Sequence, residues 1–179
     1  MNLAAELKAA ANRVEQRHLD RMAGLVSAEA LATLQHYDTH IAVAEVEEVS
    51  GFYAPIEGAP LHFITPVRVA GELIDLIAWR PARPDKWLLR TGAAWALGED
   101  HAIGDWDGAL DLHARPLDWL RAAGSGLCVL DWNAADVRQL ANVQTVRVSN
   151  PAVGRTLITA LSRPARLPTI ETMEARLAA

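Results

Sequence analysis

The sequence predicts an α/β or α+β fold in which N-terminal helices precede a central antiparallel β-meander and a C-terminal βαβα unit, with the strands in one mixed sheet. Three observations indicate this class: a closing stretch of buried apolar runs alternating with helix-start signals, a middle third with strand-like runs between turns, and an opening stretch with helical periodicity. Residues 1–40 are expected to form a helical segment and 41–179 a single mixed α/β domain, since 179 residues suffice for one sizeable core.

The closing stretch over 126–161 has the order strand, helix, strand, helix. Its two apolar runs, Leu127–Leu130 and Val143–Val148, are short and rich in valine and leucine, which is typical of strands that are buried on both faces. We therefore expect two neighbouring strands of one sheet, with the helices that follow them beginning at the same edge.

Each of these strands is followed by a helix-start signal. Asn133 can cap a helix over 134–141, because an asparagine side chain accepts hydrogen bonds from the unpaired N–H groups of a first helical turn. Asn150 has the same position after the second strand, and Pro151 suits the first helical residue that follows it.

Helical periodicity marks the N-terminus. Over 2–24, apolar side chains recur at three- and four-residue steps with charges between them, which predicts an amphipathic helix. Gly24 is a natural end for it, and Ser27 can cap a second helix with Leu31 and Leu34 on one face. The spacing leaves two arrangements open: two antiparallel helices, or one long helix that runs through Gly24 and faces another subunit.

The middle of the chain has the features of a meander. Ile41–Val49 has the β-branched content of a strand, although its glutamates would also suit a helix surface, and we favour the strand. Glycines and prolines then mark a loop up to Pro60. Three strand-like runs follow, with turns at 70–72 and 80–85 between them, and Pro66 predicts that the first run is an edge strand or contains a bulge. The three runs are Leu61–Val69, Leu73–Trp79 and Lys86–Leu89.

The connection between the meander and the closing stretch is less regular. The segment 99–111 is acidic and is predicted to be an irregular loop, after which Pro116 starts a helix over 117–123. Beyond Pro164, the tail is expected to add either an edge strand around 169–171 or a terminal helix.

Composition narrows the function classes. Hydrophobic residues make up 51% and charged residues 22% of the chain, as in globular domains, and a net charge of −5 gives no general attraction to nucleic acid. Cys128 is the one cysteine, which excludes an internal disulfide, and its apolar neighbours indicate a buried, unreactive thiol. No signal-peptide pattern and no run of about 18 apolar residues is present, so a cytoplasmic protein is expected.

The first candidate site follows from topology. In sheets with helical crossovers, ligands bind outside the carboxyl ends of the strands, where helix N-termini present unpaired N–H groups. Arg155 lies one turn into the last helix and is a potential partner for an anion. The predicted ligand-binding crevice consists of Asp131, Asn133, Ser149, Asn150 and Arg155. The alternative is that the asparagines only cap helices and that Asp131 is only a strand-end carboxylate.

The segment VSNPAVGRTLITAL, residues 148–161, resembles the strand end and Gly-Arg helix of Toprim domains in primases and topoisomerases. That family has paired aspartates where this chain has Ser149, Asn150 and Pro151, and its catalytic glutamate has no counterpart here. The resemblance implies a nucleotide- or nucleic-acid-processing domain from which metal-dependent chemistry has been lost.

The second candidate site is the basic turn between the last two strands of the meander. Basic side chains interleaved with tryptophans can bind nucleic acid or an acidic partner. A hairpin with a polar turn and core-facing tryptophans explains the same pattern, and the negative net charge favours it. The residues concerned are Arg80, Arg83, Lys86, Trp87 and Arg90.

No motif assigns a catalytic residue, a metal or a cofactor. The acidic stretch around Asp105 and Asp107 fits only part of a calcium-loop template, and His36 and His40 share a helical face without a third ligand. Nucleophile-elbow, Walker and dinucleotide-binding patterns are absent from the sequence. We therefore predict a non-catalytic accessory protein that binds a ligand or another protein, with a homodimer as one expected assembly. The alternative is an active or degenerate enzyme of nucleotide or nucleic-acid metabolism that uses the crevice.

Overall fold

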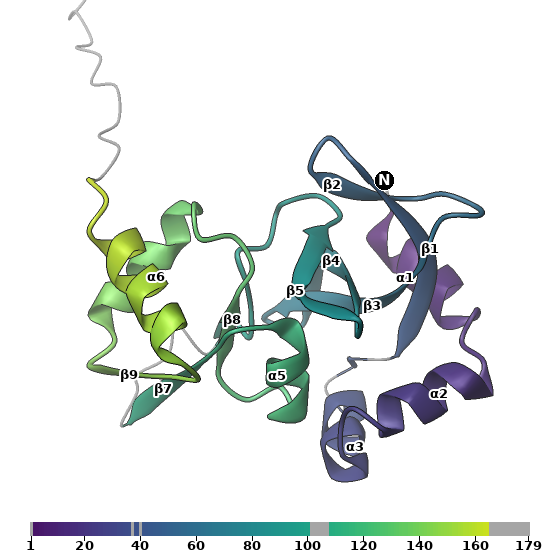
Figure 1. Cartoon of the computed structure of the whole chain (residues 1–179), viewed down its shortest axis with the longest axis horizontal. Helices are drawn as coiled ribbons and strands as arrows, with labels where there is room; N and C mark the ends of the chain where they lie inside the picture. The colour runs from purple at the N-terminus through teal and green to yellow at the C-terminus, as the bar shows by residue number, and fades with distance from the viewer. Residues whose placement is uncertain (1, 37, 40, 101–107, 165–179) are drawn as a thin grey trace, which may run out of the picture.

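The structure is a computed structural model that describes residues 2–36, 38–39, 41–100 and 108–164 (Figure 1). The chain forms helices and two β-sheets, one antiparallel and one mixed, which confirms the predicted α/β or α+β class. The elements are α1 (Leu3–Ala11), α2 (Gln16–Ala23), α3 (Ala28–His36), β1 (Ala42–Val49), β2 (Phe52–Pro55), β3 (Leu61–Val69), β4 (Glu72–Arg80), β5 (Arg83–Leu89), β6 (Ala96–Leu97), β7 (Ala109–His113), α5 (Pro116–Arg121), β8 (Leu127–Val129), the 3-10 helix η1 (Ala135–Asn142), β9 (Thr145–Val148) and α6 (Pro151–Leu161). The proposed tail elements around 169–171 lie outside the described residues.

Three short helices form the N-terminal segment, and the predicted single helix over 2–24 is wrong because the chain breaks between α1 and α2. The backbone N–H of Glu15 donates to Nδ1 of His18 at 3.0 Å, which fixes the start of α2 and separates it from α1. α2 ends as predicted, with Gly24 directly after it, so no single helix runs through this point. Oγ of Ser27 accepts the backbone N–H three residues later at 3.2 Å and caps α3, as the sequence predicts.

The first sheet is antiparallel, with the strand order β2-β1-β3-β4-β5, and contains the predicted meander. Two of its hairpins turn at Ser50-Gly51 and Ala70-Gly71, and all four residues have positive φ angles. Such two-residue turns match the right-handed twist of the flanking strands. β2 lies in the stretch whose glycines and prolines predicted only a loop. Pro66 lies beyond the part of β3 that pairs with β1 and next to a register shift at Val67, as expected for an open edge with a bulge.

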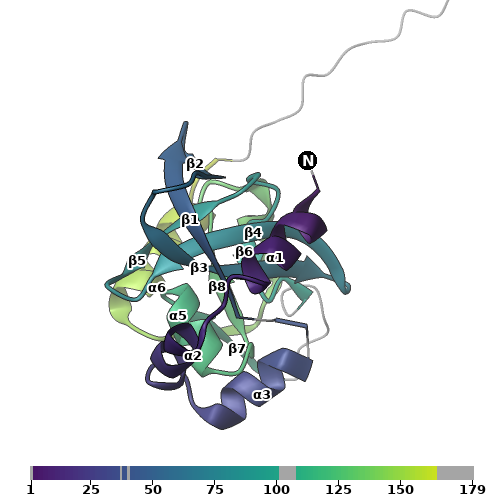
Figure 2. The same cartoon turned by 90° about the vertical axis from the view of Figure 1, so that its right-hand side faces the viewer.

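This sheet curls until its two edge strands come into contact. β1 pairs with β3 through its first half and with β2 through its second half, and β2 also touches β5. The inner face of the curl is apolar and includes Ala44, Val46, Tyr53 and Leu76. α1 lies across β1, β3 and β4 on this face and buries Leu7 there (Figure 2). The N-terminal helix therefore covers part of the inner face.

The strands form two sheets, so the prediction of one mixed sheet was wrong. The second sheet has the order β6-β8-β7-β9, in which β7 runs parallel to both β8 and β9. β7 comes from the acidic segment that suggested an irregular loop, and it lies between the two strands that were expected to be neighbours. The sheets do not merge because the outer face of the first sheet is itself apolar and packs against the second sheet and α5.

A hydrophobic core joins the two sheets. The rings of Phe63 and Trp79 from the first sheet stack with their centroids 5.5 Å apart, and Leu97 and Cys128 from the second sheet belong to the same cluster. α5 completes this core with Trp119. Cys128 is fully buried, as predicted, and burial raises the pKa of its thiol.

The buried carboxylate of Asp75 holds the segment that follows the first sheet. Asp75 on β4 has no exposed surface, and its oxygens accept backbone hydrogen bonds of 2.8–3.3 Å from Leu76, Thr91, Ala93 and Ala94. These four N–H groups replace the hydrogen bonds that the carboxylate would make with water if it were exposed. Asp75 thereby fixes the segment that carries the chain from β5 to β6. Within the described ranges, no helix combines the length and the apolar character that crossing a membrane requires.

Candidate functional site

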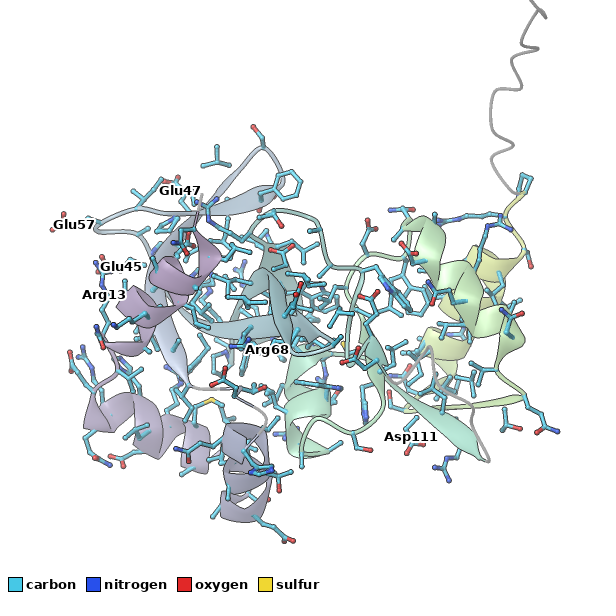
Figure 3. The ribbon with its side chains drawn as sticks, turned by 180° about the vertical axis from the view of Figure 1, so that it is seen from behind. Arg13, Glu45, Glu47, Glu57, Arg68 and Asp111 are labelled. Atoms are coloured by element: carbon cyan, nitrogen blue, oxygen red, sulfur yellow. The ribbon has the colours of Figure 1, made fainter. Side chains whose placement is uncertain are left out.

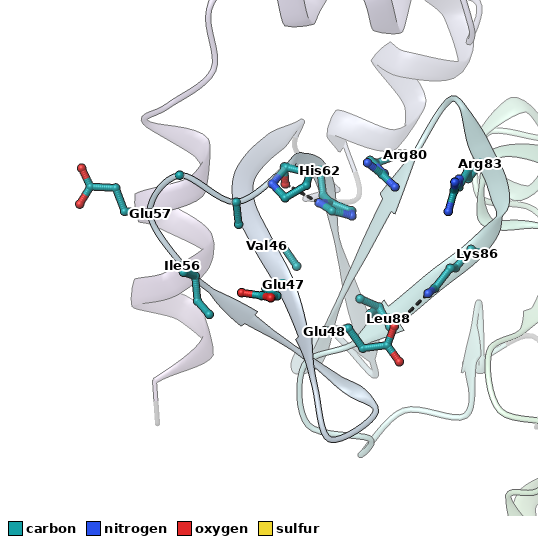
Figure 4. Close-up of a pocket in the computed structure, with 13 residues that line it drawn as sticks. Val46, Glu47, Glu48, Ile56, Glu57, His62, Arg80, Arg83, Lys86 and Leu88 are labelled. Atoms are coloured by element: carbon teal, nitrogen blue, oxygen red, sulfur yellow. Dashed lines mark hydrogen bonds and ion pairs between the residues drawn. The ribbon is translucent and has the colours of Figure 1, made fainter.

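Three of the five residues of the predicted basic turn line a cavity of about 520 Å³ on the first sheet (Figure 4). Arg80, Arg83 and Lys86 belong to the β4–β5 hairpin and form one side of this cavity. The other two residues of the turn lie elsewhere. Nε1 of Trp87 donates to the carbonyl of Leu130 at 3.1 Å, in the core between the sheets.

Arg90, the remaining residue of the predicted turn, binds the N-terminal helix. Its Nε donates to both carboxylate oxygens of Glu6 at 2.9 and 3.0 Å, and its guanidinium lies 5.5 Å from the ring centroid of Tyr53. Burial, followed by the charge of Glu6, raises the pKa of the Tyr53 hydroxyl above its ordinary value. Arg90 therefore holds α1 against the curled sheet and takes no part in the cavity.

The alternation of side chains along the strands decides which residues reach the cavity. Lys86 lies two positions before Leu88, and His62 two positions before Ile64, and both Leu88 and Ile64 pack on the inner face of the curl. Trp87 lies between Lys86 and Leu88 in the sequence, so its side chain faces the other side of the sheet, away from the cavity. Because no residue of α1 lines the cavity, the helix leaves this part of the inner face open.

The opposite side of the cavity consists of the second half of β1 and the loop over 56–60. Three hydrogen bonds tie this loop to β1: Val46 N–H to the carbonyl of Pro60 at 3.1 Å, Ile56 N–H to the carbonyl of Glu45 at 3.0 Å, and Gly58 N–H to Oε2 of Glu45 at 3.1 Å. The labelled carboxylates of Glu45 and Glu47 lie along the same edge of the molecule (Figure 3). Glu45 thus has a structural role, whereas Glu47 lines the cavity.

One ion pair bridges the two sides. Nζ of Lys86 lies 2.9 Å from Oε2 of Glu48, so β5 and β1 approach each other closely across the cavity. Arg80 and Arg83 form no ion pair with any described residue. The cavity therefore holds two guanidinium groups whose charge no neighbouring carboxylate directly compensates.

His62 adds a neutral polar group beside these arginines. Its Nδ1 lies 2.7 Å from the carbonyl of Pro60, which requires Nδ1 to carry the proton and to donate. Burial lowers the pKa of His62, the hydrogen bond to Pro60 opposes that effect, and the charges of Arg80 and Lys86 lower the pKa further. At neutral pH, Nε2 is then available as a hydrogen-bond acceptor.

The base of the cavity is apolar. Val46 is buried, Leu88 is half-buried, and Ile56 closes the side at the loop. None of the described residues that line the cavity is a serine, threonine, cysteine or tyrosine, so this lining offers no hydroxyl or thiol nucleophile. The arrangement suits binding through charge, hydrogen bonds and apolar contact.

A second cavity, of about 510 Å³, lies between α3, α5 and the β3–β4 turn. Its cation, Arg68, pairs with Asp38 and donates to the carbonyl of Gly71 at 3.1 Å. The charge of Arg68 is thus compensated within the protein, unlike those of Arg80 and Arg83. The cavity at the β4–β5 hairpin is for this reason the stronger candidate for a charged ligand.

The residues of the predicted crevice lie at one edge of the second sheet. β8 and β9 both run parallel to β7, so their carboxyl ends share that edge, although β7 separates them. Asn150 caps α6 as predicted, since its Oδ1 accepts the N–H groups of Ala152 and Val153 at 3.0 and 3.1 Å. Ser149 donates its backbone N–H to the carbonyl of Leu112 at 3.1 Å, and Arg155 is exposed on α6.

Asn133 has a different role from the predicted helix cap. Oδ1 of Asp131 accepts the backbone N–H of Asn133 at 2.8 Å, and Oδ1 of Asn133 accepts a hydrogen bond from Arg163 at 2.7 Å. The helix that follows is the 3-10 helix η1, which begins after Ala134. The side chains of Asp131, Asn133 and Asn150 are therefore all used in local turns, caps and contacts.

The residues of the cavity that sequence reasoning missed lie on other strands. His62, Glu47 and Glu48 reach the cavity only because β1 curls over the hairpin, and nothing in their local sequence indicates this. Among the described residues, no group of His, Cys, Asp and Glu side chains is arranged to hold a metal ion. His40, Asp105 and Asp107 lie outside the described residues.

Comparisons of this chain with protein-family models, with curated proteins and with solved structures found no match. The resemblance of 148–161 to Toprim domains therefore depends on that segment alone.

Proposed function

We propose that this protein is a non-catalytic binding protein for a small ligand that carries an anionic group, and that the ligand occupies the cavity at the β4–β5 hairpin. The observation that carries the proposal is the pair of arginines, Arg80 and Arg83, which line the cavity without an ion-pair partner among the described residues. The planar guanidinium group matches carboxylate and phosphate oxygens, so a bound anion would supply the missing counter-charge.

Volume and lining agree with this proposal. A cavity of about 520 Å³ lies within the range that small-molecule sites have, and such sites combine an apolar lining with a few polar groups. Here Val46 and Leu88 provide the apolar surface, while His62 adds a hydrogen-bonding group beside the arginines.

The crevice at the edge of the second sheet gives less support to the alternative, an enzyme or degenerate enzyme of nucleotide metabolism. Asp131, Asn133 and Asn150 already have partners within the protein. Of the five predicted crevice residues, Arg155 is the one whose charged side chain is exposed.

Isothermal titration calorimetry can test the proposal with two anions, inorganic phosphate and N-acetyl-alanyl-leucine. We expect at least one of them to bind, and Arg80→Gln and Arg83→Gln to weaken that binding about tenfold each, because each removes a charge-assisted hydrogen bond. Arg155→Gln is the matched control and should leave the affinity unchanged. The proposal is wrong if neither anion binds, or if Arg155→Gln abolishes binding while the hairpin variants retain it.

A further inference from the structure

Arg80 and Arg83 stand directly opposite each other across the β4–β5 hairpin. They are register partners, at the point where the register shifts after the pair Trp79 and Trp87. Side chains at directly opposite positions lie on one face of a sheet with their Cβ atoms about 5 Å apart, and like charges there repel each other. Both arginines also line the same cavity. Two positive charges are therefore held close together on one side of this cavity.

The register shift is what adds the second arginine. Because Trp79 pairs with Trp87, a regular ladder would place Lys86 opposite Arg80 and leave Arg83 in the turn. Instead, the extra residues of β5 form a bulge, and Arg83 becomes the partner of Arg80. Bulges re-aim side chains and are frequent next to functional sites. The backbone of the hairpin thus brings both guanidinium groups to the cavity.

The carboxylates of the described lining leave this pair of charges uncompensated. Glu48 is paired with Lys86 at 2.9 Å. Glu47 precedes Glu48 on β1, so strand alternation turns its side chain to the other side of that strand. The carboxylate of Glu57 points away from the cavity (Figure 4). The interior of the cavity therefore keeps the two charges of the arginines.

These two charges favour one kind of anionic group. A carboxylate carries one charge and has two oxygens in one plane, so a single guanidinium group in bidentate contact satisfies it. A phosphate monoester carries close to two negative charges at about pH 7 and has three strong acceptor oxygens. Because these oxygens point in different directions, two guanidinium groups can bind it at once, and its charge neutralises both.

We infer that the cavity binds a phosphate monoester, with the phosphate group between Arg80 and Arg83. The organic part of the ligand extends towards His62, Val46 and Leu88, which belong to the same lining. This inference depends on the proposed function, because it names the class of anion for the same cavity.

Three anions of similar size test the inference by isothermal titration calorimetry. At about pH 8, butyl phosphate carries two negative charges, methyl butyl phosphate keeps the phosphorus centre with one charge, and pentanoate is a singly charged carboxylate. We expect butyl phosphate to bind about tenfold more tightly than either of the others, because it makes charge-assisted hydrogen bonds to both guanidinium groups. Arg80→Gln and Arg83→Gln should each remove this preference, since one guanidinium group is left. Arg155→Gln, the matched control on α6, should retain it.

The ligand-free protein gives a second measurement. Because the two arginines repel each other, Arg83→Gln should leave the melting temperature without ligand unchanged or higher. Butyl phosphate should raise the melting temperature more in the unmodified protein than in this variant. A lower melting temperature of the ligand-free variant would show that Arg83 makes a stabilising contact within the protein, and would overturn the inference.

The outcomes separate this inference from the proposed function. If pentanoate or methyl butyl phosphate binds through the arginines as tightly as butyl phosphate, the monoester inference is overturned and anion binding stands. Loss of the preference in Arg155→Gln would also overturn the inference. If none of the three compounds binds while inorganic phosphate or N-acetyl-alanyl-leucine does, the inference alone fails. If none of these anions binds, both the inference and the proposed function fail.

Discussion

Asp75 has no exposed surface, and its carboxylate accepts hydrogen bonds from four backbone N–H groups between β4 and β6. In Asp75→Asn, an amide NH₂ would replace an oxygen that receives two of these N–H groups, and donors would then face donors. We expect the free energy of unfolding, measured with urea, to fall by about 3 kcal/mol. Asp131→Asn changes a half-buried carboxylate that accepts one backbone N–H, and should cost less than about 1 kcal/mol. Equal losses in the two variants would contradict this account of Asp75.

His62 makes the free energy of unfolding depend on pH. Its pKa in the folded protein lies below the ordinary 6.5, first because of burial and then because of Arg80 and Lys86. At a pH between the folded-state and unfolded-state pKa values of His62, the unfolded chain binds more protons than the folded protein. The stabilisation by neutral His62 is therefore fully present above pH 6.5 and decreases as the pH falls towards the folded-state pKa. His62→Gln should therefore flatten the pH dependence of urea unfolding between pH 6.5 and lower values. An unchanged slope in the variant would show that other groups cause it.

At the level of elements, Asn133 and Asn150 were both predicted to cap a helix after a strand, but they make different contacts. Asn150 accepts two N–H groups at the start of α6, whereas Asn133 lies in a turn before a 3-10 helix that begins after Ala134. We expect Asn150→Ala to lower the free energy of unfolding by about 1 kcal/mol, the usual cost of losing a helix cap. Asn133→Ala removes an exposed contact with Arg163 and should cost under about 0.5 kcal/mol. Urea unfolding of both variants distinguishes these values, and a larger loss for Asn133→Ala would contradict the assignment.

Local sequence signals predicted the elements whose causes are local. Glycine at a hairpin turn, Pro116 at a helix start and the short apolar runs of β3 and β4 mark structure within a few residues of themselves. β7 was missed because its neighbours are acidic, yet Leu110 and Leu112 face the core while Asp111 pairs outward with Arg147 on β9 at 2.7 Å. That pairing joins segments 36 residues apart, which no local pattern reports.

The residues of the candidate cavity could likewise be predicted only in part from local sequence. Arg80, Arg83 and Lys86 stand out as a basic cluster in the sequence, but Arg90 in the same cluster binds α1 instead. Once the strand register is known, the alternation of side chains along each strand shows which of these residues face the cavity. His62 and the β1 glutamates join the site only through the curl of the sheet, which depends on contacts between β2 and β5.

At the scale of the whole molecule, the core between the two sheets predicts that they unfold together. Its buried side chains come from both sheets, from α5 and from the α2–α3 region, including Trp79, Leu97, Trp119 and Leu34. Neither sheet can lose its partner without exposing this shared apolar surface to water. The two sheets are therefore expected to behave as one cooperative unit, which hydrogen exchange can measure for each strand separately.

The decisive variant lies in the part of the core that belongs to the second sheet alone. Leu157 on α6 packs with β7, β8 and η1, and Leu157→Ala should lower the free energy of unfolding by about 3 kcal/mol through the cavity it creates. If the sheets unfold together, the slowest amides of β3 and β4 lose the same protection as those of β7 and β8. Ile158→Ala, at the next position and 67% exposed, is the matched control and should leave both sheets unchanged. Loss of protection confined to the second sheet would show that the two sheets are separate folding units.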